Sequence, residues 1–284
     1  MTIATLWDVA QQNGFTLVIL LSVLGIVSLV ELIFPLHARG RWHRAHLVPN
    51  LALTGITLAT NLVLNTALVI LVLYLYKHEI GLLHVSGMTS LARDIVAFIA
   101  LDFSFYVCHI AMHKVPVFWR YHQVHHCDPV LDATTTVRQH PGESLIRYTF
   151  LTVATIVLGP SLYAFAAYRA WSAINGFFEH ANIRTPQWLA VSLTLLTSWP
   201  SMHRIHHSCV AAQTDTNYGN IFSIFDRLFG TFTPIREAAA VVVGLDGYYD
   251  PAAQTTCSLL KMPYSYVNGH PVHVSLPEGA AAKL

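Results

Sequence analysis

The sequence predicts an all-α fold, namely a polytopic bundle of helices integrated into a membrane. Of the 284 residues, 54% are hydrophobic and only 11% are charged, whereas soluble proteins carry about 25% charged residues. Several apolar segments reach the roughly 20 residues that a helix needs to cross a bilayer. Histidine is the unusual polar residue, because its 17 copies outnumber the 16 Lys and Arg and the 15 Asp and Glu.

The apolar segments define the expected helices in chain order. Three of them are long enough to span the membrane: residues 15–36, 47–76 and 91–112. Two more are separated by Gly159 and Pro160 and are expected to form a helical hairpin: residues 145–158 and 161–178. Residues 189–199 are too short to cross, so we expect them to be re-entrant or buried.

Basic residues set the expected orientation. The first connection holds Arg39, Arg41 and Arg44, and the positive-inside rule places such a connection in the cytoplasm. The third span then ends on the cytoplasmic side, where ten histidines fall between positions 109 and 207. No linker divides the chain, so we expect a single membrane-embedded domain with three parts: first helices at 1–100, a histidine-rich core at 101–235 and a cytoplasmic tail at 236–284.

Charge and cysteine content exclude two other classes of protein. The net charge of +1 offers no clustered basic face for nucleic acid. The four cysteines show no C-x-x-C spacing, so neither a zinc ribbon nor a disulfide framework is expected.

The histidines form three clusters whose spacing suits a helix face. Steps of three and four residues bring side chains together on one face of a helix. The clusters are His109 with His113, then His122, His125 and His126, and finally His203, His206 and His207. The pattern H-x-x-H-H thus occurs twice, and His180 stands alone between the two copies. Ionisable residues at a membrane boundary are usually functional, so we interpret the clusters as metal ligands.

The number of histidines favours two metal ions. A catalytic zinc ion uses about three protein ligands and a structural one uses four, so eight or nine histidines suit two metals with four or five imidazoles each. Imidazole binds iron, copper, zinc and nickel alike, and the ligand type does not choose among them. A di-iron pair is attractive because it can react with O2, whereas a b-type haem would leave most of the histidines unexplained.

Other polar residues are candidate supports for these ligands. Asp102 and Tyr106 precede His109 on the same helix face, where a carboxylate could hold a ring N–H and fix its tautomer; Asp102 could equally be a water-paired residue. Glu143 and Glu179 are weaker candidates for the same role. His140, in RQHPGES, is left open as a further ligand. The remaining histidines are expected to be ordinary polar residues: His37, His43, His46, His78, His84, His270 and His273.

The segments DFSFYVCHIAMH, WRYHQVHHCDP, RQHPGE, FFEHANI, MHRIHHS and NYGNIFSIFDRLFGTF carry a family resemblance. From about Asp102 to Pro234 the sequence resembles the fatty acid hydroxylase / sterol desaturase superfamily of membrane di-iron oxygenases. The resemblance implies a metal-ligand role for nine residues: His109, His113, His122, His125, His126, His180, His203, His206 and His207. Two positions depart from common family patterns, with Ile110 in place of an arginine and Gly176 in place of a second histidine near His180.

The resemblance implies an enzyme with two Fe ions and O2 as co-substrate. Such an enzyme hydroxylates, or desaturates, an unactivated C–H bond of a membrane lipid or sterol-like substrate at the cytoplasmic face. The sequence contains no G-x-G-x-x-G, flavin or Fe–S pattern, so an external electron donor of the cytochrome b5 or ferredoxin type, with its reductase, is expected. The alternatives are a membrane metal-binding or transport protein and a non-catalytic relative of the family.

Overall fold

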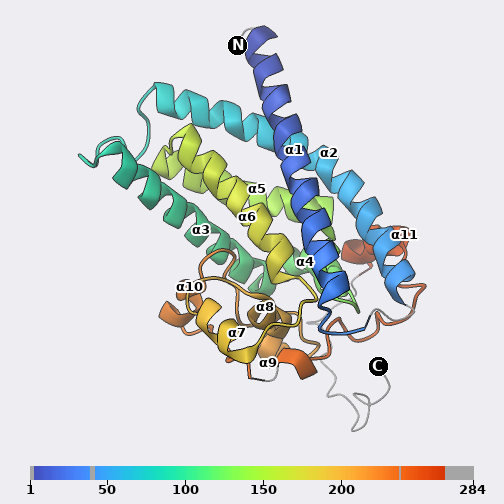
Figure 1. The fold of residues 1–284 in the computed structure, drawn as a ribbon. Helices are drawn as coiled ribbons and strands as arrows, with labels where there is room; N and C mark the ends of the chain where they lie inside the picture. Colours follow the sequence, from blue (N-terminus) through green and yellow to red (C-terminus); the bar gives the residue numbers. More distant parts are fainter. Residues whose placement is uncertain (1–2, 39–41, 237, 266–284) are drawn as a thin grey trace.

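The computed structural model describes residues 3–38, 42–236 and 238–265, and within these residues it is helical throughout, with isolated β-bridges and no strand. Long helices form the bundle: α1 (Ile3–Ile33), α2 (Trp42–Lys77), α3 (Ser90–Lys114), α5 (Pro141–Leu158) and α6 (Leu162–Glu179). Shorter α-helices connect them or gather at one end (Figure 1): α4 (Pro116–His126), α7 (Gln187–Leu193), α8 (Pro200–His206), α9 (Ala211–Thr214), α10 (Ile224–Leu228) and α11 (Thr256–Lys261). Three turns of 3-10 helix complete the set: η1 (Ala133–Val137), η2 (Ala238–Ala240) and η3 (Met262–Tyr264). The all-α prediction is confirmed.

Proline begins the helices that carry the histidine clusters. Pro116, Pro141 and Pro200 occupy the first turns of α4, α5 and α8, where a missing N–H costs nothing and the fixed φ suits the helix. A proline also disfavours helical geometry in the residue before it, so α3 ends at Lys114 and α4 starts in a new direction. The chain therefore turns sharply between the first two histidine clusters.

The hairpin of α5 and α6 turns at Gly159, which lies at the C-terminal end of α5 in the left-handed region with φ +64°. The loop after α2 packs against this turn, since Leu82 N–H donates to the Val157 carbonyl at 2.9 Å. A Cβ on Gly159 would lie 2.0 Å from the Ile80 carbonyl oxygen. Only glycine fits both the backbone conformation and this close approach.

The main core lies between α2, α3 and the hairpin. Its buried residues are Leu68, Val72, Leu101, Tyr148, Leu151, Phe165, Tyr168 and Ile221. This packing fixes the bundle on one side of the histidine-bearing helix ends, and the short helices α7 to α10 cover them from the other side (Figure 1).

Within the described residues, two helices are long and apolar enough to cross a membrane, at His46–Lys77 and Ser90–Lys114, and Val18–Ile33 is a shorter apolar segment. Large apolar side chains face outward along them; Val63, for example, is 69% exposed. Such an apolar surface suits contact with lipid. The further spans and the cytoplasmic orientation stay predictions.

The predicted cytoplasmic tail is folded in its described part. Leu245, Leu259 and Met262 are buried against Leu53 of α2 and Trp119 of α4. Residues 245–265 are thus a packed part of the structure and not a loose tail. His270 and His273 lie outside the described residues.

Candidate metal centre

Three helix ends and one short helix bring the predicted ligands together. His109 and His113 lie in the last turns of α3, the cluster from His122 to His126 ends α4, and His180 follows the last residue of α6. The third cluster lies on α8, with His207 directly after its end. All nine side chains are buried, although the residues come from places far apart in the sequence.

The nine histidines form two groups. Within each group the nitrogens that face inward all lie within 4.8 Å of one another. The first group has five members: His109, His113, His122, His126 and His206. The second has four: His125, His180, His203 and His207. Nitrogens about 2.1 Å from a shared ion would lie roughly 3 to 4 Å apart, so each group has nearly the size of a metal site.

Backbone carbonyls fix several rings so that Nε2 faces inward. Nδ1 of His109 donates to the Tyr218 carbonyl at 2.9 Å, and Nδ1 of His206 donates to the Thr216 carbonyl at 2.8 Å. Their Nε2 atoms are buried with no hydrogen-bond partner among the described residues. A lone pair buried in this way is costly, and a metal ion would satisfy it.

His180 shows the same arrangement in the second group. Its Nδ1 donates to the Gly176 carbonyl at 2.7 Å, which leaves a bare lone pair on Nε2. That Nε2 lies 3.0 Å from Nε2 of both His125 and His203. The Nε2 lone pair of His180 is directed at neighbouring ring nitrogens and has no proton to share with them. Such an arrangement fits a cation bound between the rings, so the donor set of each group fits a metal.

Electrostatics keep six of the rings outside α3 neutral. Burial lowers the pKa of these six because a buried cation loses its hydration, and neighbouring rings add to the effect in most of them: His125, His126, His180, His203, His206 and His207. The pKa falls to about 4 for His180 and about 3 for His206, and it falls well below 6.5 for His125, His126, His203 and His207. Neutral imidazole is the form that binds metals.

Two carboxylates approach the rings of the first group. Glu143 Oε1 lies 3.3 Å from Nδ1 of His122, and Asp215 Oδ1 lies 3.4 Å from Nδ1 of His113. A carboxylate behind a ligating histidine orients the ring and makes it a stronger ligand. Glu179 is more distant, with Oε1 3.9 Å from Nε2 of His203.

Asp102 and Tyr106 have other partners than the sequence suggested. The Asp102 carboxylate accepts hydrogen bonds from the side chain of Asn220 and from the backbone N–H groups of Ile221 and Phe222. The Tyr106 hydroxyl pairs with Thr231 at 2.7 Å. Both residues therefore hold the segment after α9 against α3, and the Tyr218 carbonyl of that segment in turn orients His109.

His140 lies outside both groups. Its Nδ1 accepts from Gly142 N–H at 2.9 Å as the N-cap of α5, and its Nε2 donates to the Leu260 carbonyl at 3.2 Å. Both ring nitrogens are thus used within the protein. The structure assigns His140 to capping α5 and holding the segment near α11.

His46 was expected to be an ordinary polar residue and is instead buried between two carboxylates. Its Nδ1 lies 2.9 Å from Asp128 and its Nε2 lies 2.9 Å from Asp132. Asn50, one turn further along α2, donates to the same Asp128 at 3.2 Å. The feature of the sequence that indicates this site is the acidic pair, Asp128 and Asp132, that follows the second cluster in HHCDPVLD. Two buried carboxylates need a cation beside them.

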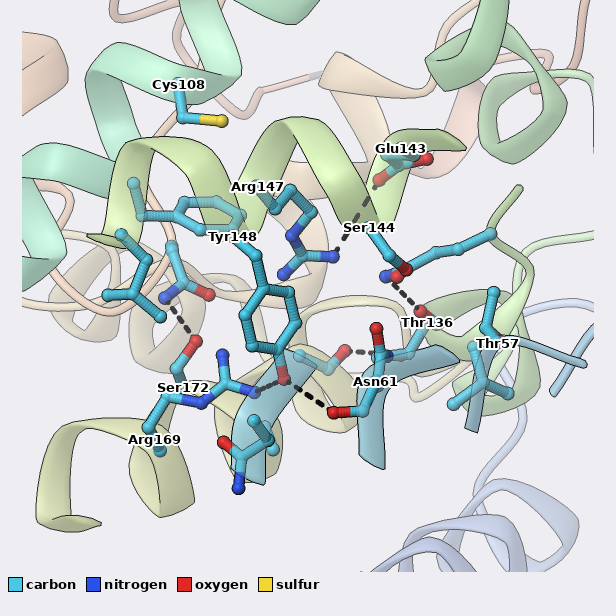
Figure 2. Close-up of a pocket in the computed structure, with 18 of the residues that line it drawn as sticks. Thr57, Asn61, Cys108, Thr136, Glu143, Ser144, Arg147, Tyr148, Arg169 and Ser172 are labelled. Atoms are coloured by element: carbon cyan, nitrogen blue, oxygen red, sulfur yellow. Dashed lines mark hydrogen bonds and ion pairs between the residues drawn. The ribbon is translucent and has the colours of Figure 1, made fainter. Parts of the chain in front are cut away.

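A cavity of about 400 Å³ adjoins the histidines (Figure 2). It is lined by α2, α3, α5 and α6, and it reaches His122, His125 and His180. Most of its lining is apolar, and its volume is in the range of small-molecule sites, about 300–1,000 Å³.

Comparisons with known proteins agree with these features. Residues 94–231 match the fatty acid hydroxylase family. The alkylglycerol monooxygenase of Danio rerio is 31% identical over 150 residues, 53% of this chain and 32% of that protein. Ornithine lipid hydroxylase OlsE of Rhizobium tropici is 29% identical over 197 residues, 66% of this chain and 57% of that protein.

A third relative is the very-long-chain aldehyde decarbonylase GL1-11 of Oryza sativa subsp. indica, 30% identical over 148 residues, 51% of this chain and 53% of that protein. The matched parts thus span between about a third and little over half of these relatives. No solved structure matches the chain.

Proposed function

We propose that the chain, whose histidine-bearing residues 94–231 match the fatty acid hydroxylase family, is an O2-dependent oxidoreductase that uses two iron ions. The substrate is a membrane lipid, and the reaction replaces a C–H bond by C–OH. One oxygen atom enters the substrate and the other leaves as water, so the reaction consumes two electrons and two protons. The electrons come from an external donor of the cytochrome b5 or ferredoxin type.

The observation that carries this proposal is the double histidine group. Five and four buried histidines surround two adjacent centres, and three of them present a bare Nε2 lone pair because a carbonyl holds their Nδ1 proton. When bound there, two iron ions would supply the electrons and Lewis acidity that activate O2. Nine ligands exceed the needs of a single structural zinc ion.

The residues of the chain position the substrate and exclude water. The cavity beside the histidines is walled by apolar side chains of the bundle, so a lipid chain can lie next to the metals in a dry environment. A water-poor site protects a strong oxidant from side reactions. The three relatives are named as enzymes of lipids or of a long-chain aldehyde, which supports an apolar substrate.

Iron content and turnover test the proposal together. The purified chain, loaded anaerobically with Fe(II), is expected to hold two irons and to add one oxygen to a lipid when O2, reductant and donor protein are supplied. His125→Ala and His206→Ala each remove a ligand from a different group, so each should lose iron and turnover. His78→Ala, an exposed histidine beyond the end of α2, is the matched control and should retain both.

The same experiment separates the alternatives. Undiminished turnover in both His125→Ala and His206→Ala would contradict the metal centre. Metal uptake into proteoliposomes without O2 consumption would instead indicate a transport protein. Bound iron with no product from total membrane lipids would indicate a non-catalytic relative, and a product lighter by two hydrogens would indicate desaturation.

A further inference from the structure

The cavity beside the histidines carries cations that the proposed metal centre does not use. Arg147 of α5 and Arg169 of α6 both line it, and Figure 2 shows them on either side of Tyr148, with Arg147 closer to Glu143. Both lie on the hairpin that packs against α2 and α3, and both are partly buried. A cation within an apolar membrane-embedded bundle is costly and usually marks a substrate or ion path.

Arg169 has only neutral partners for its charge. It donates to the Tyr148 hydroxyl at 2.8 Å, and its guanidinium lies 5.0 Å from the centre of the same ring. Among the described residues no carboxylate oxygen lies within 4.0 Å of it, although the side chain is only partly exposed. A guanidinium placed in this way keeps donors available for an anion.

Arg147 is almost as poorly neutralised. Its nearest carboxylate is Glu143, with the nitrogen and oxygen 3.8 Å apart, and Glu143 also faces His122 at 3.3 Å. The guanidinium lies 4.8 Å from the centre of the Phe105 ring. The cavity wall therefore carries two guanidinium groups, and its two carboxylates are Glu143, beside Arg147, and Glu179.

Other polar atoms of the cavity also lack partners. Oγ of Ser144 and Oδ1 of Asn61 are buried without a hydrogen-bond partner among the described residues. Both residues line the cavity together with the arginines. A purely hydrocarbon ligand would leave these groups unsatisfied, whereas a polar head group would pair with them.

Arg169 and the histidines are far enough apart for an elongated ligand, whereas Arg147 lies nearer to them beside Glu143. Arg169 lies eleven residues before His180 along α6, which corresponds to about 16 Å at 1.5 Å per residue. The wall between them is mostly apolar and includes Phe165, Ala173 and Phe177. A molecule with a charged end and an apolar chain fits both the charge and the length.

We propose that this cavity binds an anionic single-chain lipid, with its carboxylate or phosphate on the guanidinium groups of Arg169 and Arg147 and its chain extending to the histidines. The guanidinium fork binds either oxyanion through two parallel hydrogen bonds. This inference names the substrate class of the proposed function and rests on it. Carboxylate and phosphate share the recognition chemistry, so the experiment includes both.

Binding is measured separately from turnover. The iron-loaded chain in neutral detergent, without O2 or reductant, is equilibrated with tritiated palmitate, and unlabelled amphiphiles compete. Palmitate or hexadecyl phosphate should compete at least about tenfold better than methyl palmitate, because the ester loses the charge-assisted hydrogen bonds. The better of the two anions identifies the head group, and equal competition by methyl palmitate would overturn the proposal.

Variants locate the selectivity at Arg169. Arg169→Gln should reduce the preference for anion over ester to near one, whereas Arg169→Lys, which keeps the charge, should retain a clear preference. Tyr148→Phe removes the hydroxyl partner of Arg169 but no cation, so it should keep the preference for anion over ester. That result would exclude a merely structural role for Arg169. Arg184→Gln changes an exposed arginine and is the matched control. An unchanged preference in folded Arg169→Gln would contradict the assignment.

Failure of this inference is distinguishable from failure of the proposed function. If palmitate binds selectively through Arg169 but no lipid is oxidised, the anion site stands and the oxygenase proposal falls. If the loaded enzyme oxidises methyl palmitate as readily as palmitate, the oxygenase proposal stands and the anion site falls.

Discussion

Replacing His46 by leucine should destabilise the protein more than any other single change at a histidine outside the two groups. His46 links α2 to the loop after the second histidine cluster through Asp128 and Asp132, both at 2.9 Å. All three residues are at most 2% exposed. Leucine has nearly the volume of histidine but leaves two buried carboxylates without their shared partner.

The expected loss follows from this burial. Removing one partner of a buried ion pair costs about 3–5 kcal/mol, and at about 2–4 °C per kcal/mol for a protein of this size class the Tm should fall by roughly 6–20 °C. Burial alone would raise the pKa of Asp132, but hydrogen bonds from His46 and Thr134 and the charge of His46 lower it to about 2. Relative to an ordinary pKa of 3.8, this lowering corresponds to about 2 kcal/mol.

The pH dependence has opposite signs in the two proteins. In the wild type the stabilisation through Asp132 is fully present above about pH 4 and is lost as the pH falls toward the folded-state pKa of about 2. In His46→Leu, burial without the cation should raise the pKa of Asp132 above its ordinary range, because His46 is the cation that acts on it, whereas Asp128 still faces Arg138. The variant should therefore become more stable as the pH falls from 7 to 5.

Thermal unfolding in detergent, followed by circular dichroism at pH 7 and pH 5, measures both effects. His78→Leu, an exposed change beyond the far end of α2, should leave the Tm within about 2 °C of wild type. Adding Asp132→Asn to His46→Leu should recover part of the loss, because the carboxylate that lost its cation is then neutral, whereas Asp128 keeps the charge of the buried Arg138. A Tm drop below about 2 °C in His46→Leu, with no gain at pH 5, would refute the buried ion pair.

Three further predictions concern the metal centre and its supports. Removal of iron by a chelator should lower the Tm, since a ligand present at 1,000 times its Kd stabilises by about 4 kcal/mol; an identical Tm in calorimetry with and without iron would argue against bound metal. Glu143→Gln removes the carboxylate 3.3 Å from His122 and should weaken iron binding about 10–100-fold in a titration, so an unchanged affinity would deny it that role. Asp102→Asn should lower the free energy of unfolding by about 1–3 kcal/mol and should retain two irons. Loss of iron without destabilisation would instead indicate that Asp102 orients a histidine ring, as its sequence position suggested.

The helices could be predicted from sequence because their signals are local. The lengths of the apolar segments predicted α1, α2 and α3, and the prolines and Gly159 indicated several helix boundaries. The folding of residues 245–265 onto the bundle could not be predicted in this way. It depends on a few apolar residues such as Leu259 and Met262 that are buried by α2 and α4, and a short segment rich in polar residues gives no periodic signal for such long-range contacts.

The convergence of the histidines was predictable, but their supports were not. Helical spacing places two or three rings on a face, and the family resemblance suggested that the faces meet. The partner of each Nδ1 depends on tertiary structure, as with the Tyr218 carbonyl behind His109. Backbone carbonyls have no sequence signature, whereas carboxylates do, and the carboxylate of Asp102 lies on the predicted helix face but contacts a loop.

Asp102 and His46 have the same function in the architecture, on opposite sides of the centre. Asp102 fixes the segment at Ile221 and Phe222 to α3, and His46 fixes the loop at Asp128 to α2. Each is a buried charged or polar group that binds a loop to a long helix of the bundle: His46 binds the loop directly after the second histidine cluster, and Asp102 binds the segment after α9. Two groups of neutral imidazoles cannot hold such loops in place before a metal binds, because uncharged rings attract one another weakly. The contacts of Asp102 and His46 therefore keep the ligands close together in the metal-free chain. Loss of either residue should slow iron loading more than loss of an exposed polar residue.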